Sequence, residues 1–220
     1  WKHRESYYND FSRSPLLFHM RSTEGPPVCI ADVNNDGLDD FYVGGARGQS
    51  GALFLQSRSG RFQETTQPAL KADRRSEDTA CEFLDATGDG TPELYVGSGS
   101  SEFASGSSAL ADRLYESSEA GRLTPLEGSL PSRKGKTIPT GAVQSADLEG
   151  DGDIDLFVGT RMALPSQDTA RGYGMPVGGR IFLNNGNGRF KDATSKIAPG
   201  LTPRRLRSAG ITDAVWQDLT

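Results

Sequence analysis

The sequence predicts an all-β protein built from β-propeller blades of four antiparallel strands, with about three blades and the start of a fourth. An acidic nine-residue motif begins at Asp32, Asp85 and Asp147, and each copy is followed by two apolar residues and a Val-Gly step. A strand–turn–strand pattern with a glycine in its turn then follows each motif. A four-stranded unit that repeats roughly every 50 to 70 residues is typical of a propeller blade.

The acidic motif has the ligand spacing of a calcium-binding loop. In residues 32–40, oxygen-bearing side chains occupy positions 1, 3, 5 and 9, and Gly37 occupies position 6. Ca²⁺ takes six to eight oxygen ligands, and glycine permits the sharp turn that gathers them. One such stretch also fits a solvated acidic turn, but three copies in register favour calcium. The predicted Ca²⁺ ligands are Asp32, Asn34, Asp36, Leu38 (through its backbone carbonyl) and Asp40 in the first loop (32–40), Asp85, Thr87, Asp89, Thr91 and Glu93 in the second (85–93), and Asp147, Glu149, Asp151, Asp153 and Asp155 in the third (147–155).

Each repeat is expected to contain a strand, the acidic loop, a second strand ending in Val-Gly, a variable loop and a β-hairpin. Glycine in the hairpin turn supplies the positive φ that tight turns need. Helical patterning is almost absent, and residues 109–116 fit a hairpin strand better than a helical turn. The second strands are expected at residues 41–44, 94–97 and 156–159. The hairpin glycines are Gly60, Gly121 and Gly188.

The repeat region is expected to cover residues 28–220, preceded by a lead-in or outer closing strand at residues 1–27. Residues 214–220 align with residues 143–149, which makes Asp218 the first ligand of a truncated fourth loop. We therefore expect the chain to be part of a larger protein. Open blade edges in such a partial propeller are sites for pairing with another chain, so self-association is expected.

Charge and hydropathy exclude several classes of partner. The chain has 24 basic and 29 acidic residues, and twelve of the acids lie in the three loops, so the acidity is local. The basic residues form no stripe interleaved with aromatic residues, so no nucleic-acid partner is expected. No run of roughly 18 apolar residues occurs, so no membrane span is expected in this segment. Residues 1–5 lack the apolar region of a signal peptide, so any export signal lies upstream.

The two cysteines precede the first two loops at different distances. Cys29 lies three residues before Asp32, and Cys81 lies four residues before Asp85. An odd difference in offset places the two side chains on opposite faces of equivalent strands. This disfavours a disulfide, and two buried thiols acting as small apolar residues are the expected state.

The repeated loop and Val-Gly step resemble the FG-GAP/VCBS repeat family, which includes the propellers of integrin α-subunits. Residues 8–11 and 22–26 further resemble bacterial VCBS proteins of the ASPIC/UnbV-associated type, often from Bacteroidetes. The resemblance implies a propeller of seven or eight blades, export from the cytoplasm, and roles in adhesion or ligand binding. Thr87 and Pro92 depart from the motif and predict that the second site is the weakest.

No catalytic constellation is readable, so the chain is not expected to be an enzyme. Both histidines, His3 and His19, lie in the lead-in, and the paired carboxylates are explained by calcium spacing. The predicted function is a calcium-stabilised extracytoplasmic scaffold for binding or adhesion that recognises a protein or glycan. The alternative is a glycan-binding lectin or a glycan-processing lyase or hydrolase on the same propeller. The long loops at 98–108 and 161–179 are either plain surface insertions or binding surfaces. If they bind a partner, the residues of first interest are Met162, Tyr173 and Met175.

Overall fold

The computed structural model describes residues 1–12, 20–104, 106–131, 137–161 and 178–198. These residues form three four-stranded antiparallel sheets, in which each strand pairs with the next along the chain, and this confirms the predicted all-β fold. We call the sheets the first, second and third blade. Their strands are β1 (Val28–Ala31), β2 (Asp40–Val43), β3 (Ala52–Gln56) and β4 (Phe62–Glu64); β5 (Asp78–Leu84), β6 (Glu93–Ser98), β7 (Arg113–Ser117) and β8 (Leu123–Pro125); and β9 (Thr140–Ala146), β10 (Asp155–Thr160), β11 (Arg180–Leu183) and β12 (Lys191–Asp192).

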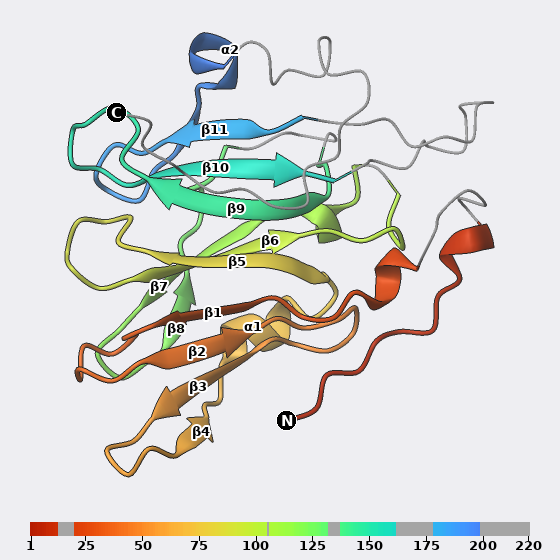
Figure 1. The fold of residues 1–220 in the computed structure, drawn as a ribbon, viewed down its shortest axis with the longest axis horizontal. Helices are drawn as coiled ribbons and strands as arrows, with labels where there is room; N and C mark the ends of the chain where they lie inside the picture. Colours follow the sequence, from red (N-terminus) through yellow and green to blue (C-terminus); the bar gives the residue numbers. More distant parts are fainter. Residues whose placement is uncertain (13–19, 105, 132–136, 162–177, 199–220) are drawn as a thin grey trace.

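The blades stack side by side in the manner of a propeller. The first strand of each blade lies beside the first strand of its neighbour, so that β1, β5 and β9 follow one another (Figure 1). Within the described part of the chain, the three blades form an open arc rather than a closed ring. The predicted fourth blade, which begins at Asp218, lies outside the described residues.

The predicted hairpins are present in all three blades. They join the third and fourth strands, and Gly60, Gly121 and Gly188 have φ values of 75°, 65° and 66° in their turns. Glycine reaches this left-handed region at no steric cost, which other residues do not. In the second blade the hairpin strand β7 begins only at Arg113, after the short 3-10 helix η3 (Ser108–Leu110).

The hydrophobic core lies between the blades. Residues of one sheet alternate between its two faces, and the two faces contact different neighbours. The first interface buries Val33, Tyr42, Leu53 and Leu70 against Leu94, Val96, Tyr115 and Leu123. The second interface buries Ala80, Leu84, Ala86, Tyr95 and Leu114 against Val143, Leu156, Val158, Phe182 and Phe190.

One face of the first blade has no neighbour among the described residues. Ile30, Phe41 and Phe54 form a row across β1, β2 and β3 on that face. The Phe41 and Phe54 rings stack with centroids 4.7 Å apart, and Ile30 is 65% exposed. The corresponding rows of the second and third blades are packed against the preceding blade, so this row is an uncovered copy of a blade–blade contact.

Short helices lie outside the sheets. α1 (Pro68–Ala72) follows the first blade, and its Leu70 is buried in the first interface. α2 (Thr194–Ile197) follows the third blade. The described helices are all short, and none has the length and apolarity that a bilayer-spanning helix requires.

The lead-in contacts the loops at the Val-Gly end of the first two blades. Its described parts contain the 3-10 helices η1 (Asp10–Ser12) and η2 (Arg21–Thr23) and no strand. The backbone N–H of Arg4 donates to Gln49 (2.7 Å), and Asp10 accepts hydrogen bonds from Ser22 and Ser101. These bonds fix the lead-in to the propeller-like unit.

The cysteines form a disulfide, so the prediction of two buried thiols is wrong. Cys29 in β1 is bonded to Cys81 in β5, with their Cα atoms 5.9 Å apart. The two side chains do lie on opposite faces of their own sheets. Tyr42 and Tyr95 are equivalent residues of the two blades, and Cys29 pairs with Tyr42, whereas Cys81 pairs with Val96, the residue after Tyr95. The prediction failed because it assumed that side chains on opposite faces could not form a disulfide. When two blades stack, opposite faces meet, so a bridge between them requires opposite faces.

Candidate metal-binding loops

The three acidic loops lie at the same end of the blades. Each joins the first strand of a blade to the second, and all three lie at the left of the view in Figure 1. The strand register brings the ends of each loop together, because the residue at loop position 9 pairs with the last residue of the preceding strand. The first two loops also touch, since the amide nitrogen of Asn35 donates to Thr91 Oγ1 (3.2 Å).

The carboxylate at loop position 1 organises the turn. In the first loop, Asp32 accepts hydrogen bonds from the backbone N–H groups of Asp36 (3.0 Å) and Gly37 (2.7 Å). Asp85 accepts the equivalent pair in the second loop, and Asp147 does so in the third. An aspartate that bonds nearby backbone N–H groups stabilises a turn, so the same local geometry forms three times.

The carboxylate at loop position 5 faces the next part of the turn. Asp36 accepts from the backbone N–H of Leu38 (2.9 Å), and Asp89 accepts from that of Thr91 (2.8 Å). Asp151 accepts from the N–H of Asp153 in the same way, at 3.1 Å. Each of these bonds uses one carboxylate oxygen, and Asp36 also accepts from the Asn34 amide with its other oxygen. A carboxylate has about four lone-pair sites, so each group keeps acceptor capacity.

The carboxyl group at loop position 9 is the buried member of each set. Asp40, Glu93 and Asp155 are at most 2% exposed. Each accepts the backbone N–H of loop position 2, at 3.1, 2.7 and 2.9 Å respectively. Asp40 also accepts from Gln56 N (2.8 Å) and Asp155 from Asn184 N (2.8 Å), so the group ties the loop to the third strand.

Electrostatics show that the carboxylates of each loop gather together. Burial raises the pKa of Asp40, Glu93 and Asp155, and the negative charges at positions 1 and 5 of the same loop raise it further. For Glu93 the pKa rises to about 7. A carboxylate whose pKa is raised by neighbouring negative charges is repelled by them in the folded state, and a bound cation would relieve that repulsion.

The remaining predicted ligands have other hydrogen-bond partners. At position 3, the side chain of Asn34 bonds to Asp36, and Thr87 Oγ1 donates to Glu93 (3.3 Å). Thr91, at position 7, accepts the bond from Asn35. Glu149, at position 3 of the third loop, is exposed.

The loops match Ca²⁺ in chemistry but do not hold their carboxylates in metal-binding geometry. All the predicted side-chain ligands are oxygen donors, which is what a hard cation requires. Within the described ranges, however, no three His, Cys, Asp or Glu side chains converge as a metal site. The reason is visible in the hydrogen bonds, because the carboxylates at positions 1, 5 and 9 bond to backbone N–H groups.

Sequence reasoning missed a buried polar junction at each blade interface. Asp78 accepts from the hydroxyl of Tyr42 (2.6 Å) and from Arg113 (2.5 Å) at the first interface. Asp112 accepts from Tyr95 (2.8 Å) and Arg180 (3.2 Å) at the second. Both tyrosines stand two residues after loop position 9, and both arginines begin a third strand, so the repeat of Tyr and Arg was the available signal.

Four residues of interest fall outside the described part of the chain. These are Met162, Tyr173 and Met175, the candidates for a partner surface, and His19 in the lead-in.

The comparison with known families supports the repeat. Residues 32–96 match the FG-GAP-like repeat family, a range that begins at the first loop's Asp32 and ends in β6. It contains both of the first two acidic loops and the hairpin between them. A comparison with curated proteins found no match for the chain.

Proposed function

We propose that this chain is a calcium-stabilised binding scaffold that acts outside the cytoplasm, in adhesion or in recognition of a protein or glycan. The observation that carries the proposal is the threefold recurrence of one carboxylate arrangement. In every loop, positions 1 and 5 raise the pKa of the buried carboxyl at position 9. The match of residues 32–96 to an FG-GAP-like repeat supports a propeller-type scaffold.

The residues that would hold Ca²⁺ are those at positions 1, 3, 5, 7 and 9 of each loop. Bound Ca²⁺ would supply charge neutralisation, so that carboxylates which now repel one another could share one cation. The buried carboxyl at position 9 would then link the cation to the third strand, through its bond to Gln56 or Asn184. At free Ca²⁺ of about 100 times Kd, one site stabilises the fold by about 2.7 kcal/mol.

The second loop is proposed as the weakest site. A threonine hydroxyl, which is neutral, stands at its third position, and Thr87 already donates that hydroxyl to Glu93. Pro92 removes a degree of backbone freedom next to the ninth position. Rearrangement of the loop around a cation therefore costs more there than in the other two loops.

The disulfide supports action outside the cytoplasm. Disulfides persist in oxidising compartments and are rare where thioredoxin and glutathione keep thiols reduced. The bond between Cys29 and Cys81 joins two blades and is part of the fold. Calcium sites in extracellular modules bind weakly, with Kd of ~10⁻⁴–10⁻³ M, which suits the same calcium-rich surroundings.

The uncovered row of the first blade supports self-association. Ile30, Phe41 and Phe54 occupy the positions at which the second and third blades pack on a preceding blade. The occupant that fits best is a further blade of this repeat type, which a second copy of the chain carries. The proposed contact surface is therefore an open face of the first blade, whereas the sequence predicted pairing at open blade edges.

Thermal unfolding tests the calcium proposal directly. The chain is melted in about 5 mM Ca²⁺, above the Kd range of extracellular modules, in the same concentration of Mg²⁺, and in chelator. A rise of Tm that is specific to Ca²⁺ supports the proposal, and equal Tm values in all three conditions contradict it. Binding to a glycan array, with and without chelator, then tests glycan recognition separately.

A further inference from the structure

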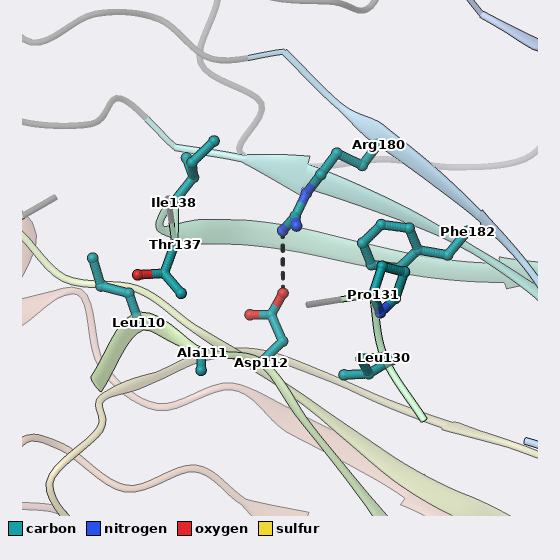
Figure 2. Close-up of a pocket in the computed structure, with 9 residues that line it drawn as sticks. All are labelled: Leu110, Ala111, Asp112, Leu130, Pro131, Thr137, Ile138, Arg180 and Phe182. Atoms are coloured by element: carbon teal, nitrogen blue, oxygen red, sulfur yellow. Dashed lines mark hydrogen bonds and ion pairs between the residues drawn. The ribbon is translucent and has the colours of Figure 1, made fainter. Parts of the chain in front are cut away.

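A cavity of about 180 Å³ lies between the second and third blades, away from the acidic loops. Figure 2 shows it with the side chains of Arg180 and Asp112 pointing toward one another across it. Arg180 belongs to β11 of the third blade, and Asp112 precedes β7 of the second, so the cavity is completed only when the two blades pack.

The wall of the cavity combines apolar and polar side chains. Leu110, Leu130, Pro131, Ile138 and Phe182 line it, with Thr137 at one side (Figure 2). The Thr137 hydroxyl donates a hydrogen bond to the carbonyl of Ser107 (2.6 Å), so its proton is not available to a ligand. By volume, the site can hold a molecule somewhat larger than benzene, since an apolar cavity of about 150 Å³ binds benzene.

Arg180 carries unused hydrogen-bonding capacity inside this wall. It is 9% exposed, its guanidinium lies 5.0 Å from the centre of the Phe182 ring, and its contact with Asp112 is a single bond of 3.2 Å. Its Nε–H has no partner. A buried donor without a partner is costly, so this nitrogen marks the place where a ligand's acceptor atom would bind.

The carboxylate of Asp112 has several hydrogen-bond donors besides the Arg180 guanidinium. Its carboxylate already accepts from the Tyr95 hydroxyl (2.8 Å), the Ser98 backbone N–H (2.9 Å) and the Thr140 hydroxyl (2.8 Å). The equivalent arginine at the first interface, Arg113, makes more hydrogen bonds than Arg180 does. Arg113 donates to Asp78 at 2.5 Å and to Ser98 Oγ at 3.0 Å, although its Nε also lacks a partner.

We propose that this cavity is a binding site for a small, neutral, apolar molecule that carries one carbonyl oxygen. The apolar body fills the space between Leu130, Ile138 and Phe182, and the carbonyl oxygen accepts the Nε–H of Arg180. A neutral acceptor fits better than a carboxylate, because Arg180 and Asp112 already balance each other and an added anion would be buried without a partner.

Acetophenone, α-methylstyrene and benzoate are the probes that test this site. The first two have the same shape, but α-methylstyrene replaces the carbonyl oxygen with a methylene group, and benzoate adds a charge. NMR titration of the 220-residue chain should show acetophenone binding about tenfold to a hundredfold more tightly than α-methylstyrene, the loss expected for one hydrogen bond to a charged group. Acetophenone should also bind more tightly than benzoate, whose charge would be buried without a partner. Equal binding of acetophenone and α-methylstyrene, tighter binding of benzoate, or no binding of acetophenone would overturn the proposal.

Two variants locate the binding to this cavity. Arg180→Lys keeps a cation beside Asp112 but removes the Nε–H, and should reduce acetophenone affinity to that of α-methylstyrene. Leu130→Phe narrows the apolar side without touching Arg180, and should abolish binding of both probes. Thr124→Ser, at an exposed position of strand β8, is the matched control and should leave all affinities unchanged. Unchanged acetophenone affinity in Leu130→Phe would place the site elsewhere and overturn the assignment.

Discussion

Cys29 and Cys81 join two neighbouring blades from opposite faces of their own sheets. The same geometry recurs at the next interface. Glu82 occupies the position of Cys29 in the second blade, and it accepts a hydrogen bond of 2.8 Å from Ser145 of the third. Both cross-links therefore follow from how stacked blades meet, with one polar and the other covalent.

Removal of the disulfide is predicted to destabilise the chain strongly. The bond closes a loop with a sequence separation of 52 residues, for which the chain-entropy treatment gives about 4 kcal/mol. The double variant Cys29→Ser/Cys81→Ser should lose roughly that free energy of unfolding in urea titrations. Reducing agent should lower the stability of the parent chain toward that of the variant and leave the variant unaffected. A parent chain insensitive to reducing agent would contradict the prediction.

Substitution of one acidic ligand is predicted to have opposite effects with and without calcium. Asp151→Asn keeps an oxygen that can accept the N–H of Asp153 but removes a charge that repels Asp155. In chelator the variant should be as stable as the parent or slightly more so. In saturating Ca²⁺ it should lose the contribution of one site, about 2.7 kcal/mol at 100 times Kd, which thermal unfolding would measure.

The matched control for this experiment is Asp39→Asn. Asp39 is exposed and stands at position 8 of the first loop, which is not a predicted ligand position. The Asp39→Asn substitution removes the same charge as Asp151→Asn, and this variant should keep the full calcium-dependent rise in Tm. A similar loss in both variants would mean that the calcium-dependent rise in Tm depends only on total charge, and the assignment of specific ligands would fail.

The sequence predicted the blades well because their signals are local. The apolar pairs with their Val-Gly steps and the hairpin glycines each depend on a few neighbouring residues, and the strands form where those patterns occur. Each acidic stretch forms a turn between two strands, and this turn geometry follows from aspartate bonding to nearby backbone N–H groups, as at Asp32.

The contacts between blades could not be predicted from local pattern. The disulfide depends on which faces of two sheets meet, and the junction of Tyr95, Asp112 and Arg180 joins residues up to 85 positions apart in the chain. Periodicity tells which residues share a face of one sheet. It does not tell which face of the next sheet they contact, and that is a property of how the blades stack.

Loss of a tyrosine hydroxyl at a blade interface is predicted to weaken the contact between two blades. Tyr95→Phe keeps the buried ring and removes a hydrogen bond to the carboxylate of Asp112. A hydrogen bond to a charged group contributes about 1.5–3 kcal/mol, which should appear in the free energy of unfolding. Tyr7→Phe, in the fully exposed part of the lead-in, should have no measurable effect. Equal stability of Tyr95→Phe and the parent would show that the junction contributes nothing.

The stability of the chain is predicted to fall between pH 4.5 and pH 8 because of Glu77. Burial raises the pKa of Glu77 from 4.5 to about 8, and the nearby charges of Glu102 and Glu5 add to the rise. Over this range the unfolded chain has released the proton while the folded chain retains it, so folding is favoured at the lower pH and loses free energy as pH rises. Below pH 4.5 the group is protonated in both states and contributes no difference.

Glu77→Gln removes this titration and tests its sign. The variant should match the parent near pH 4 and exceed it above pH 8, by a Tm difference of roughly 10 to 20 °C. The exposed Glu116→Gln serves as control and should show the same Tm difference from the parent at every pH. A variant less stable than the parent at pH 9 would mean that Glu77 is stabilised as a carboxylate, and the predicted direction would be wrong.

Self-association is predicted to depend on the uncovered row of the first blade. Ile30 is 65% exposed and lies beside Phe41, so a charge at this position would be buried in any blade–blade contact. Analytical ultracentrifugation should show concentration-dependent association of the parent chain and a monomer for Ile30→Lys. Thr124→Lys places the same charge at an exposed position of β8 in the second blade, and this variant should associate like the parent. A parent that remains monomeric at high concentration, or an Ile30→Lys variant that associates equally well, would show that this face does not bind a second copy.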